Sequence, residues 1–347
     1  MPQATFYFPG GFLWGTATAA HQVEGNNTNN TWYAWEQEPG RIKDGQKSGL
    51  ACDWWGGRWR EDLDRAADAG QNTHRMSLEW SRIQPEPERW DEYALDHYRE
   101  IVRGMVDRGM MPMITLHHFT DPLWLAEQGG WESAQTPGKF AAFARRVVEA
   151  LQEYTNLWVT INEPNVYMYS GYVSAEFPPG KRSLDTAFRV AANLIRGHAE
   201  AYAAIHAQQR TARVGIAQNF RGFVPAHPNF PLDRLVAGIQ HRIFNDSIPR
   251  ALVNGTADFV RTRVRIPEAA HTLDFLGVNT YTRDHVAFSP FLPDQGFGRN
   301  FFPAGADLSG TGFISNEPEG MFEALRWAHR FGVPLMVTEN GVDDADD

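Results

Sequence analysis

Residues 157–164 read LWVTINEP, a short run of apolar and β-branched residues that ends in Asn162, Glu163 and a proline. A run of this length and composition predicts a buried strand. Asn162 and Glu163 come where the strand ends, so their polar side chains are expected at its carboxyl end. This pattern of an apolar strand followed by polar groups recurs along the chain and decides the fold.

Seven segments share the pattern. The predicted strands are Leu13–Ala17, His74–Leu78, Pro112–His117, Leu157–Asn162, Arg213–Asn219, Leu273–Asn279 and Pro334–Glu339. Longer segments with helical periodicity lie between them, and the clearest cover residues 91–108, 136–154, 183–208 and 319–330. Strands that alternate with helices are typical of parallel βα units. We therefore predict an α/β fold, a (β/α)8 TIM barrel formed as a single domain by residues 1–347.

The predicted barrel lacks one strand, because a closed barrel of this kind needs eight and the sequence ends directly after the seventh. We therefore expect the eighth βα unit to be missing and the domain to be incomplete at its C-terminal end. Residues 288–316 are rich in Gly, Pro and Phe without periodicity, and they are expected to form a long surface loop.

The amino-acid composition excludes several classes of binding partner and indicates a cellular location. Lys and Arg number 32 against 42 Asp and Glu, and the resulting net charge of -10 argues against nucleic acid or an anionic membrane as a partner. Cys52 is the only cysteine, so an intramolecular disulfide is impossible and a reducing cytoplasm is the expected location. The N-terminus has neither the basic nor the apolar region of a signal peptide, and no stretch of about 18 apolar residues could span a membrane.

Polar groups at the ends of parallel strands converge on one face of a barrel, which is where barrel enzymes have their active sites. In chain order these residues are Gln22, Glu24, Arg75, Glu79, His117, His118, Asn162, Glu163, Asn219, Asn279, Tyr281, Glu339 and Asn340. A structural protein has little reason to direct so many polar groups into one mouth, so the set predicts an enzyme.

Two of these residues, Glu163 and Glu339, are carboxylates on the fourth and seventh predicted strands. For either alone, an ion pair at a strand end is an equally good explanation. Together they suit glycoside hydrolysis, which commonly uses two carboxyl groups that flank the bond to be cut. A carboxylate beside Arg75 would stay ionised as the nucleophile, and its charge would raise the pKa of its partner, which could then act as an acid.

Six motifs then make a family resemblance. The sequence TINEP at Thr160–Pro164 resembles the acid/base motif of family 1 glycoside hydrolases, and TENG at Thr338–Gly341 resembles their nucleophile motif. The other four occur in the expected order: FPGGFLWGTATAAHQVEG (Phe8–Gly25), HRMSLEWSRIQP (His74–Pro85), TLHHF (Thr115–Phe119) and DFLGVNTY (Asp274–Tyr281). The resemblance covers essentially the whole chain.

The resemblance implies a retaining β-glycosidase that hydrolyses terminal β-D-glycosides, with β-glucosides as the expected substrates, through a glycosyl-enzyme intermediate. It implies Glu163 as the acid/base and Glu339 as the nucleophile. Arg75 and Tyr281 would position Glu339. The sugar would be bound by Gln22, His118, Asn162, Asn279 and Tyr281, and no cofactor is expected.

Two alternatives remain open. The first is an inactive fragment or sugar-binding remnant, because family members continue past Asp347 and their further segment carries a Glu and a Trp that bind the outer hydroxyls of the sugar. The second is a metal-dependent hydrolase or lyase, with His117 and His118 as the candidate ligands. Adjacent residues of a strand point to opposite faces, so these two histidines are not expected to share one ion.

Overall fold

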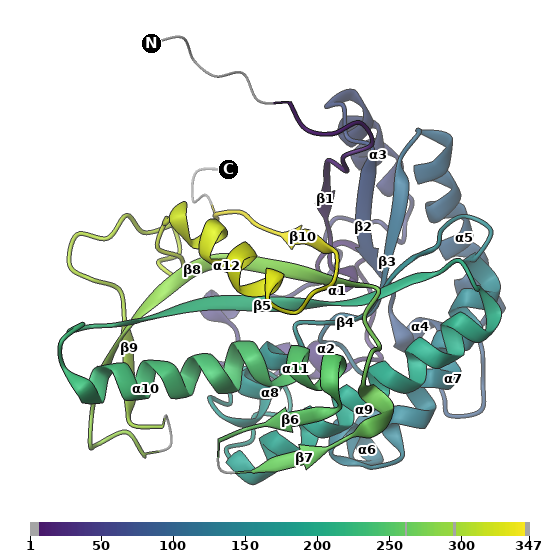
Figure 1. Cartoon of the computed structure of the whole chain (residues 1–347). Helices are drawn as coiled ribbons and strands as arrows, with labels where there is room; N and C mark the ends of the chain where they lie inside the picture. Colours follow the sequence, from purple (N-terminus) through teal and green to yellow (C-terminus); the bar gives the residue numbers. More distant parts are fainter. Residues whose placement is uncertain (1–6, 261, 294–295, 344–347) are drawn as a thin grey trace, which may run out of the picture.

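A parallel sheet forms the centre of the computed structural model, which describes residues 7–260, 262–293 and 296–343 (Figure 1). Its strands follow one another in sequence order: β1 (Gly15–Ala17), β2 (Thr73–Ser77), β3 (Met111–His117), β4 (Leu157–Asn162), β5 (Arg213–Pro225), β8 (Phe275–Phe288) and β10 (Leu335–Glu339). All neighbouring strands in this series pair in parallel. The fold is that of a (β/α)8 barrel, of which the described residues supply seven parallel strands.

Each predicted strand is confirmed, but β5 and β8 continue past their predicted ends at Asn219 and Asn279. Beyond the barrel these two strands keep pairing with each other, and β9 (Gly298–Phe301) adds to β8 in the antiparallel direction. The prediction of an irregular loop over residues 288–316 is therefore wrong at β9. The sequence of β9, GRNF, has no apolar alternation, and backbone pairing to β8 holds it in place. Residues 294–295 of the predicted loop lie outside the described residues.

Helices cover the outside of the sheet (Figure 1). Those predicted from periodicity are α5 (Glu92–Asp107), α7 (Thr136–Leu151), α9 (Leu184–Gln208) and α12 (Glu319–His329). The other α-helices are α1 (Ala20–Val23), α2 (Thr31–Glu36), α3 (Trp59–Asp68), α4 (Trp80–Ile83), α6 (Leu123–Glu127), α8 (Pro164–Tyr172), α10 (Pro231–His241) and α11 (Ser247–Asn254). No helix in the described part of the chain is long and apolar enough to cross a membrane.

Short elements complete the outline. They are the 3-10 helices η1 (Lys43–Gly45), η2 (Gly130–Glu132) and η4 (Pro267–Ala269), the π-helix η3 (Arg242–Asp246), and a small hairpin of β6 (Thr256–Asp258) and β7 (Arg263–Arg265). Local chemistry sets the start of the long helices: the side chains of Asp91 and Ser183 accept backbone N–H groups in the first turns of α5 and α9.

Besides a small cluster of Val236, Ala237 and Val286 between α10 and β8, the core of the described residues has two parts. The larger part lies between the sheet and its helices and contains buried Trp80, stacked on Phe143. The smaller part fills the inside of the barrel with Met113, Leu157, Val159, Ala217 and Phe275. Side chains therefore close the barrel interior, and the polar strand ends lie at its carboxyl mouth.

The two ends of the strand series, β1 and β10, lie near each other (Figure 1). Within the described residues, however, no ladder of hydrogen bonds joins them. All three residues of β1 are exposed, and Val337 of β10 is 48% exposed. Among the described residues, the outward N–H and C=O groups of β1 and β10 thus have no strand partner.

Candidate active site

The carboxyl ends of five strands bring the predicted catalytic and binding residues together. Arg75 lies on β2, Asn162 ends β4, Asn279 and Tyr281 lie on β8, and Glu339 ends β10. Glu163 and His118 directly follow β4 and β3. This is the arrangement that the sequence predicted for the mouth of a parallel barrel.

Glu339 is bound through both carboxylate oxygens. Arg75 Nη1 lies 2.5 Å from Oε1, and the Tyr281 hydroxyl donates to Oε2. Burial alone would raise the pKa of Glu339, but the Arg75 charge, His118 and the Tyr281 hydrogen bond hold this pKa below its usual range. Glu339 is therefore ionised at neutral pH.

Arg75 is buried, and its guanidinium links three strands to Glu339. Its Nε donates to Thr115 Oγ1 at 2.9 Å, and its Nη2 donates to Asn162 Oδ1 at 2.6 Å. A planar guanidinium with its donors fixed in this way keeps one orientation, so Glu339 has a fixed direction as well.

Glu163 adopts a left-handed backbone conformation, with φ 43° and ψ 58°. Its N–H donates to Ala217 O at 2.6 Å, and Pro164 begins α8 directly after it. A residue before proline is disfavoured in the right-handed helical region, and the left-handed one costs a non-glycine residue about 1–2 kcal/mol. This cost is incurred where the chain turns the Glu163 side chain into the mouth.

Two amides hold the Glu163 carboxyl group. Asn279 Nδ2 and Asn219 Nδ2 donate to its Oε1 at 2.8 and 2.9 Å. Burial and then the charge of Glu339 raise the pKa of Glu163 to about 7, against the opposite effect of the two amides. At pH 6 most of the molecules thus carry a proton on Glu163 beside an ionised Glu339.

Two of the predicted sugar-binding residues have a free polar atom. Asn162 accepts from Arg75 and from Asn279 through Oδ1, whereas its Nδ2 has no partner among the described residues. His118 Nδ1 is also without a partner there, and burial lowers the His118 pKa to about 3, so its ring is neutral. Gln22 lies in α1, is exposed, and makes no side-chain hydrogen bond within the described part of the chain.

His117 points away from this site, as the strand alternation predicts. It is buried beside Asp121 and Trp131, with Nε2 3.0 Å from Asp121 Oδ1. Among the described residues no group of three or more His, Cys, Asp or Glu side chains could hold a metal ion. The two histidines thus lie in different surroundings, His117 beside Asp121 and His118 near Glu339 and Arg75.

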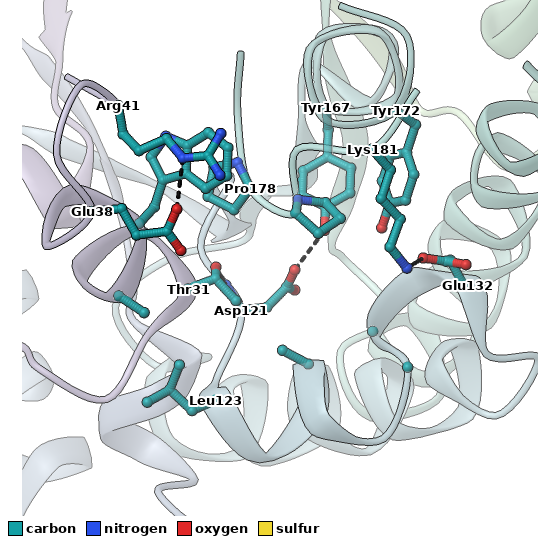
Figure 2. A pocket seen from close by; sticks show the side chains of 16 residues that line it. Thr31, Glu38, Arg41, Asp121, Leu123, Glu132, Tyr167, Tyr172, Pro178 and Lys181 are labelled. Atoms are coloured by element: carbon teal, nitrogen blue, oxygen red, sulfur yellow. Dashed lines mark hydrogen bonds and ion pairs between the residues drawn. The ribbon is translucent and has the colours of Figure 1, made fainter. Parts of the chain in front are cut away.

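A cavity of about 310 Å³ lies apart from the two carboxylates, between α2, α6, η2 and the segment at Pro178 (Figure 2). Its charged side chains make hydrogen bonds and ion pairs with other side chains of this chain. Tyr167 donates to Asp121 at 2.6 Å, Lys181 lies 2.5 Å from Glu132, and Arg41 pairs with Glu38. The three carboxylates of the cavity, Asp121, Glu132 and Glu38, are thus held by Tyr167, Lys181 and Arg41.

Three further residues of the network had been given no role in the site. Asn219 holds Glu163, Thr115 orients Arg75, and Thr338 Oγ1 donates to Asn279 Oδ1 at 2.6 Å, so that the Asn279 amide faces Glu163. Asn219 was expected at the barrel mouth because it ends a predicted strand, but its bond to Glu163 was not predicted. The two threonines belong to the motifs TLHHF and TENG, but neither motif predicts the hydrogen bonds that these hydroxyls make.

Comparison with known proteins agrees with this geometry. The family model for glycosyl hydrolase family 1 matches residues 4–347. The chain belongs to this family. It is therefore a glycoside hydrolase of the β-glycosidase kind.

Family 1 relatives with different names resemble the chain. The β-glycosidase from Pyrococcus horikoshii is 38% identical, with a TM-score of 0.88 over 96% of this chain and 76% of that one. The β-glucosidase from Thermotoga maritima in complex with glucoimidazole is 28% identical, with a TM-score of 0.89 over 96% and 79%. A β-galactosidase from Sulfolobus acidocaldarius is 30% identical over 98% of this chain and 80% of its own length.

Proposed function

We propose that the chain is a retaining β-glycosidase that acts on β-glucosides, with Glu339 as the nucleophile and Glu163 as the acid/base. The observation that carries the proposal is the opposite electrostatic setting of the two carboxyl groups. Arg75 and Tyr281 keep Glu339 ionised, whereas burial and the charge of Glu339 keep a proton on Glu163. Two carboxyl groups whose pKa values are pushed apart suit one nucleophile and one acid.

In the first step a Glu339 oxygen attacks the anomeric carbon while the bond from that carbon to the leaving oxygen breaks. The Glu163 proton passes to the leaving oxygen, and the sugar stays bound to Glu339 as an ester. Esterification removes the charge of Glu339, which is one of the causes that raise the Glu163 pKa. Glu163 then remains a carboxylate, ready to act as a base.

In the second step Glu163 takes a proton from water, and the water oxygen attacks the anomeric carbon. The ester bond breaks, Glu339 leaves as a carboxylate, and the sugar is released with its original anomeric configuration. The free Nδ2 of Asn162 is suited to donate to a sugar hydroxyl, since its Oδ1 is already engaged by Arg75.

The preference for glucosides draws on the names of the relatives, which include both β-glucosidases and β-galactosidases. A panel of p-nitrophenyl β-D-glucoside, galactoside, fucoside and mannoside tests it. The highest kcat/KM is expected for the glucoside, and a clear preference for another sugar would replace that part of the proposal.

Catalysis is tested with Glu339→Gln, using Glu127→Gln on an exposed face of α6 as the matched control. Glu339→Gln should lose turnover by at least about a thousandfold because the amide cannot form the ester, and Glu127→Gln should keep it. Proton NMR of the first-formed sugar should show the β anomer. An α anomer would indicate inversion and remove the intermediate. A folded parent chain that binds glucose without turning over any glycoside would instead be a sugar-binding protein.

A further inference from the structure

Another buried carboxyl group, that of Glu79, joins the loops that follow the first three strands. Glu79 comes two residues after β2 and is 1% exposed. Its Oε1 accepts from the Thr120 hydroxyl at 2.9 Å, and its Oε2 accepts from Asn27 Nδ2 at 2.8 Å. Asn27 lies in the loop after α1, which follows β1, and Thr120 lies in the loop after β3.

These two loops carry residues expected to bind sugar. Gln22 lies in α1, five residues before Asn27, and His118 comes two residues before Thr120. Neither the Gln22 side chain nor His118 Nδ1 has a hydrogen-bond partner in the described part of the chain. Their positions therefore depend on how the backbone around them is held. Glu79 binds both of these loops, through Asn27 and Thr120.

Charged and titratable groups face Glu79 from three elements. Glu24, at the end of α1, is 2% exposed and binds Arg82 Nε of α4 at 2.7 Å. Tyr98 of α5 donates its hydroxyl proton to Glu24 at 2.7 Å and accepts the Glu79 N–H at 2.9 Å. Arg82 thus forms its ion pair with Glu24.

The direct partners of the Glu79 carboxyl group are uncharged. They are the Asn27 amide and the hydroxyls of Thr120 and Ser81, the latter 3.2 Å away. No Lys, Arg or His in the described ranges lies within 4.0 Å of it. Two buried carboxylates cannot share one guanidinium without a large desolvation cost, and hydroxyls can accept as well as donate. Burial, and next the charge of Glu24, raise the pKa of Glu79 to about 8.

We propose that Glu79, as the uncharged acid, is a positioning residue that holds the loops of Gln22 and His118 in the geometry that binds sugar. Ionisation places a second negative charge beside Glu24 and loosens both loops. The role in sugar binding rests on the proposed function, whereas the bond between the loops does not.

The kinetic consequence is a change in KM with little change in kcat. Contacts to sugar hydroxyls that exist in both the bound substrate and the transition state contribute to binding, so their loss raises KM. At pH 6, Glu79→Gln should match the parent, because an amide has the shape and neutrality of the acid. Glu79→Ala should raise KM about tenfold while kcat changes less than about threefold. Glu61→Gln, on an exposed face of α3, is the matched control and should change neither quantity.

The pH dependence separates this role from a purely structural one. Between pH 6.5 and 9 the KM of the parent should rise, and the KM of Glu79→Gln should stay level. The unfolded chain loses this proton near pH 4.5 and the folded one near pH 8, so folding loses stability across that interval. The unfolding temperature of Glu79→Gln relative to the parent should therefore climb between these values and stay constant above them.

Hydrogen exchange of residues 24–30 and 118–123, measured by mass spectrometry, reads the loops without any need for activity. Exchange should be about tenfold faster in Glu79→Ala and unchanged in Glu79→Gln. Should Glu79→Ala fail to fold, Thr120→Val removes one of the bonds without a charge change and should raise both exchange and KM.

Equal exchange in all variants, or a parallel rise of KM with pH in the parent and Glu79→Gln, overturns the proposal. A parent that hydrolyses no glycoside overturns the proposed function instead. Exchange then still decides whether Glu79 holds the loops.

Discussion

At the scale of single residues, Arg75 is the side chain on which the charge of Glu339 depends. Its side chain is 4% exposed and pairs with Glu339, whereas the pair of Arg65 with Asp62 is largely exposed. We expect Arg75→Met to raise the Glu339 pKa, to move the acid limb of the kcat/KM profile to higher pH, and to lower the free energy of unfolding by about 3–5 kcal/mol. Arg65→Met should cost less than about 1 kcal/mol. An unmoved acid limb in a folded Arg75→Met protein would contradict this account of Glu339.

Glu163 sets the other limb of the same profile. The proposed acid must carry its proton, so kcat/KM should fall as the pH rises through about 7. Linkage gives the stability: a pKa raised from 4.5 to about 7 means that folding is favoured fully below pH 4.5 and loses about 3 kcal/mol by pH 7. In urea titrations, the free energy of unfolding of Glu163→Gln should therefore rise relative to that of the parent between these pH values. A constant difference would mean that Glu163 is ionised throughout.

At the scale of helices and strands, close packing decides what a glycine can become. An ideal Cβ on Gly104 of α5 would lie 2.3 Å from the Trp59 ring, whereas one on Gly238 of α10 would meet nothing within 4 Å. Gly104→Ala should therefore lower the free energy of unfolding by about 1–3 kcal/mol, and Gly238→Ala should raise it by about 1 kcal/mol. Urea denaturation of the two variants measures both changes in the free energy of unfolding. An increase for Gly104→Ala would mean that Trp59 moves away at little cost.

The same scale explains what the sequence could predict. β4 was predicted to the residue, because Leu157–Asn162 is apolar, short and followed by a turn. The continuation of β5 and β8 was missed because, past the barrel, burial alternates along each strand and the strands no longer form continuous apolar runs. The sequence of β9 has no alternation of apolar residues, and this segment is a strand because it pairs with β8.

The candidate site divides in the same way. Glu163 and Glu339 could be located because a polar residue after an apolar run can be recognised in the sequence, and Arg75 was singled out within the predicted strand His74–Leu78. The left-handed backbone of Glu163 and the bond from Thr338 to Asn279 depend on which strands become neighbours. The hydrogen bond from Thr338 to Asn279 joins residues 59 positions apart, so no pattern of neighbouring residues in the sequence indicates it.

At the scale of the whole molecule, β1 and β10 are edge strands at which, within the described residues, the parallel series is open to other chains. Val337 on β10 and Leu308 in a loop are both 48% exposed, and Val337 alone lies on a strand edge. We expect Val337→Lys to reduce aggregation and binding of a hydrophobic dye well below the parent level, and Leu308→Lys to have a smaller effect. Light scattering on heating compares them, and equal effects would mean that exposed apolar area matters and edge position does not.

The order of the strands also bears on how the molecule can be made. From β1 to β10 each strand of the parallel sheet lies beside the one before it in sequence, and within the described residues no ladder joins the first strand to the last. Each unit can therefore dock on the edge left by its predecessor while the rest of the chain is still leaving the ribosome. The loops closed at each step are those of one crossover, and only the addition of β10 brings the two ends of the strand series together, where Arg75 binds Glu339 across 264 positions of the sequence. Synthesis from the N-terminus and growth of the sheet can then proceed in the same direction, and the catalytic pair is complete only when the last strand arrives with Glu339.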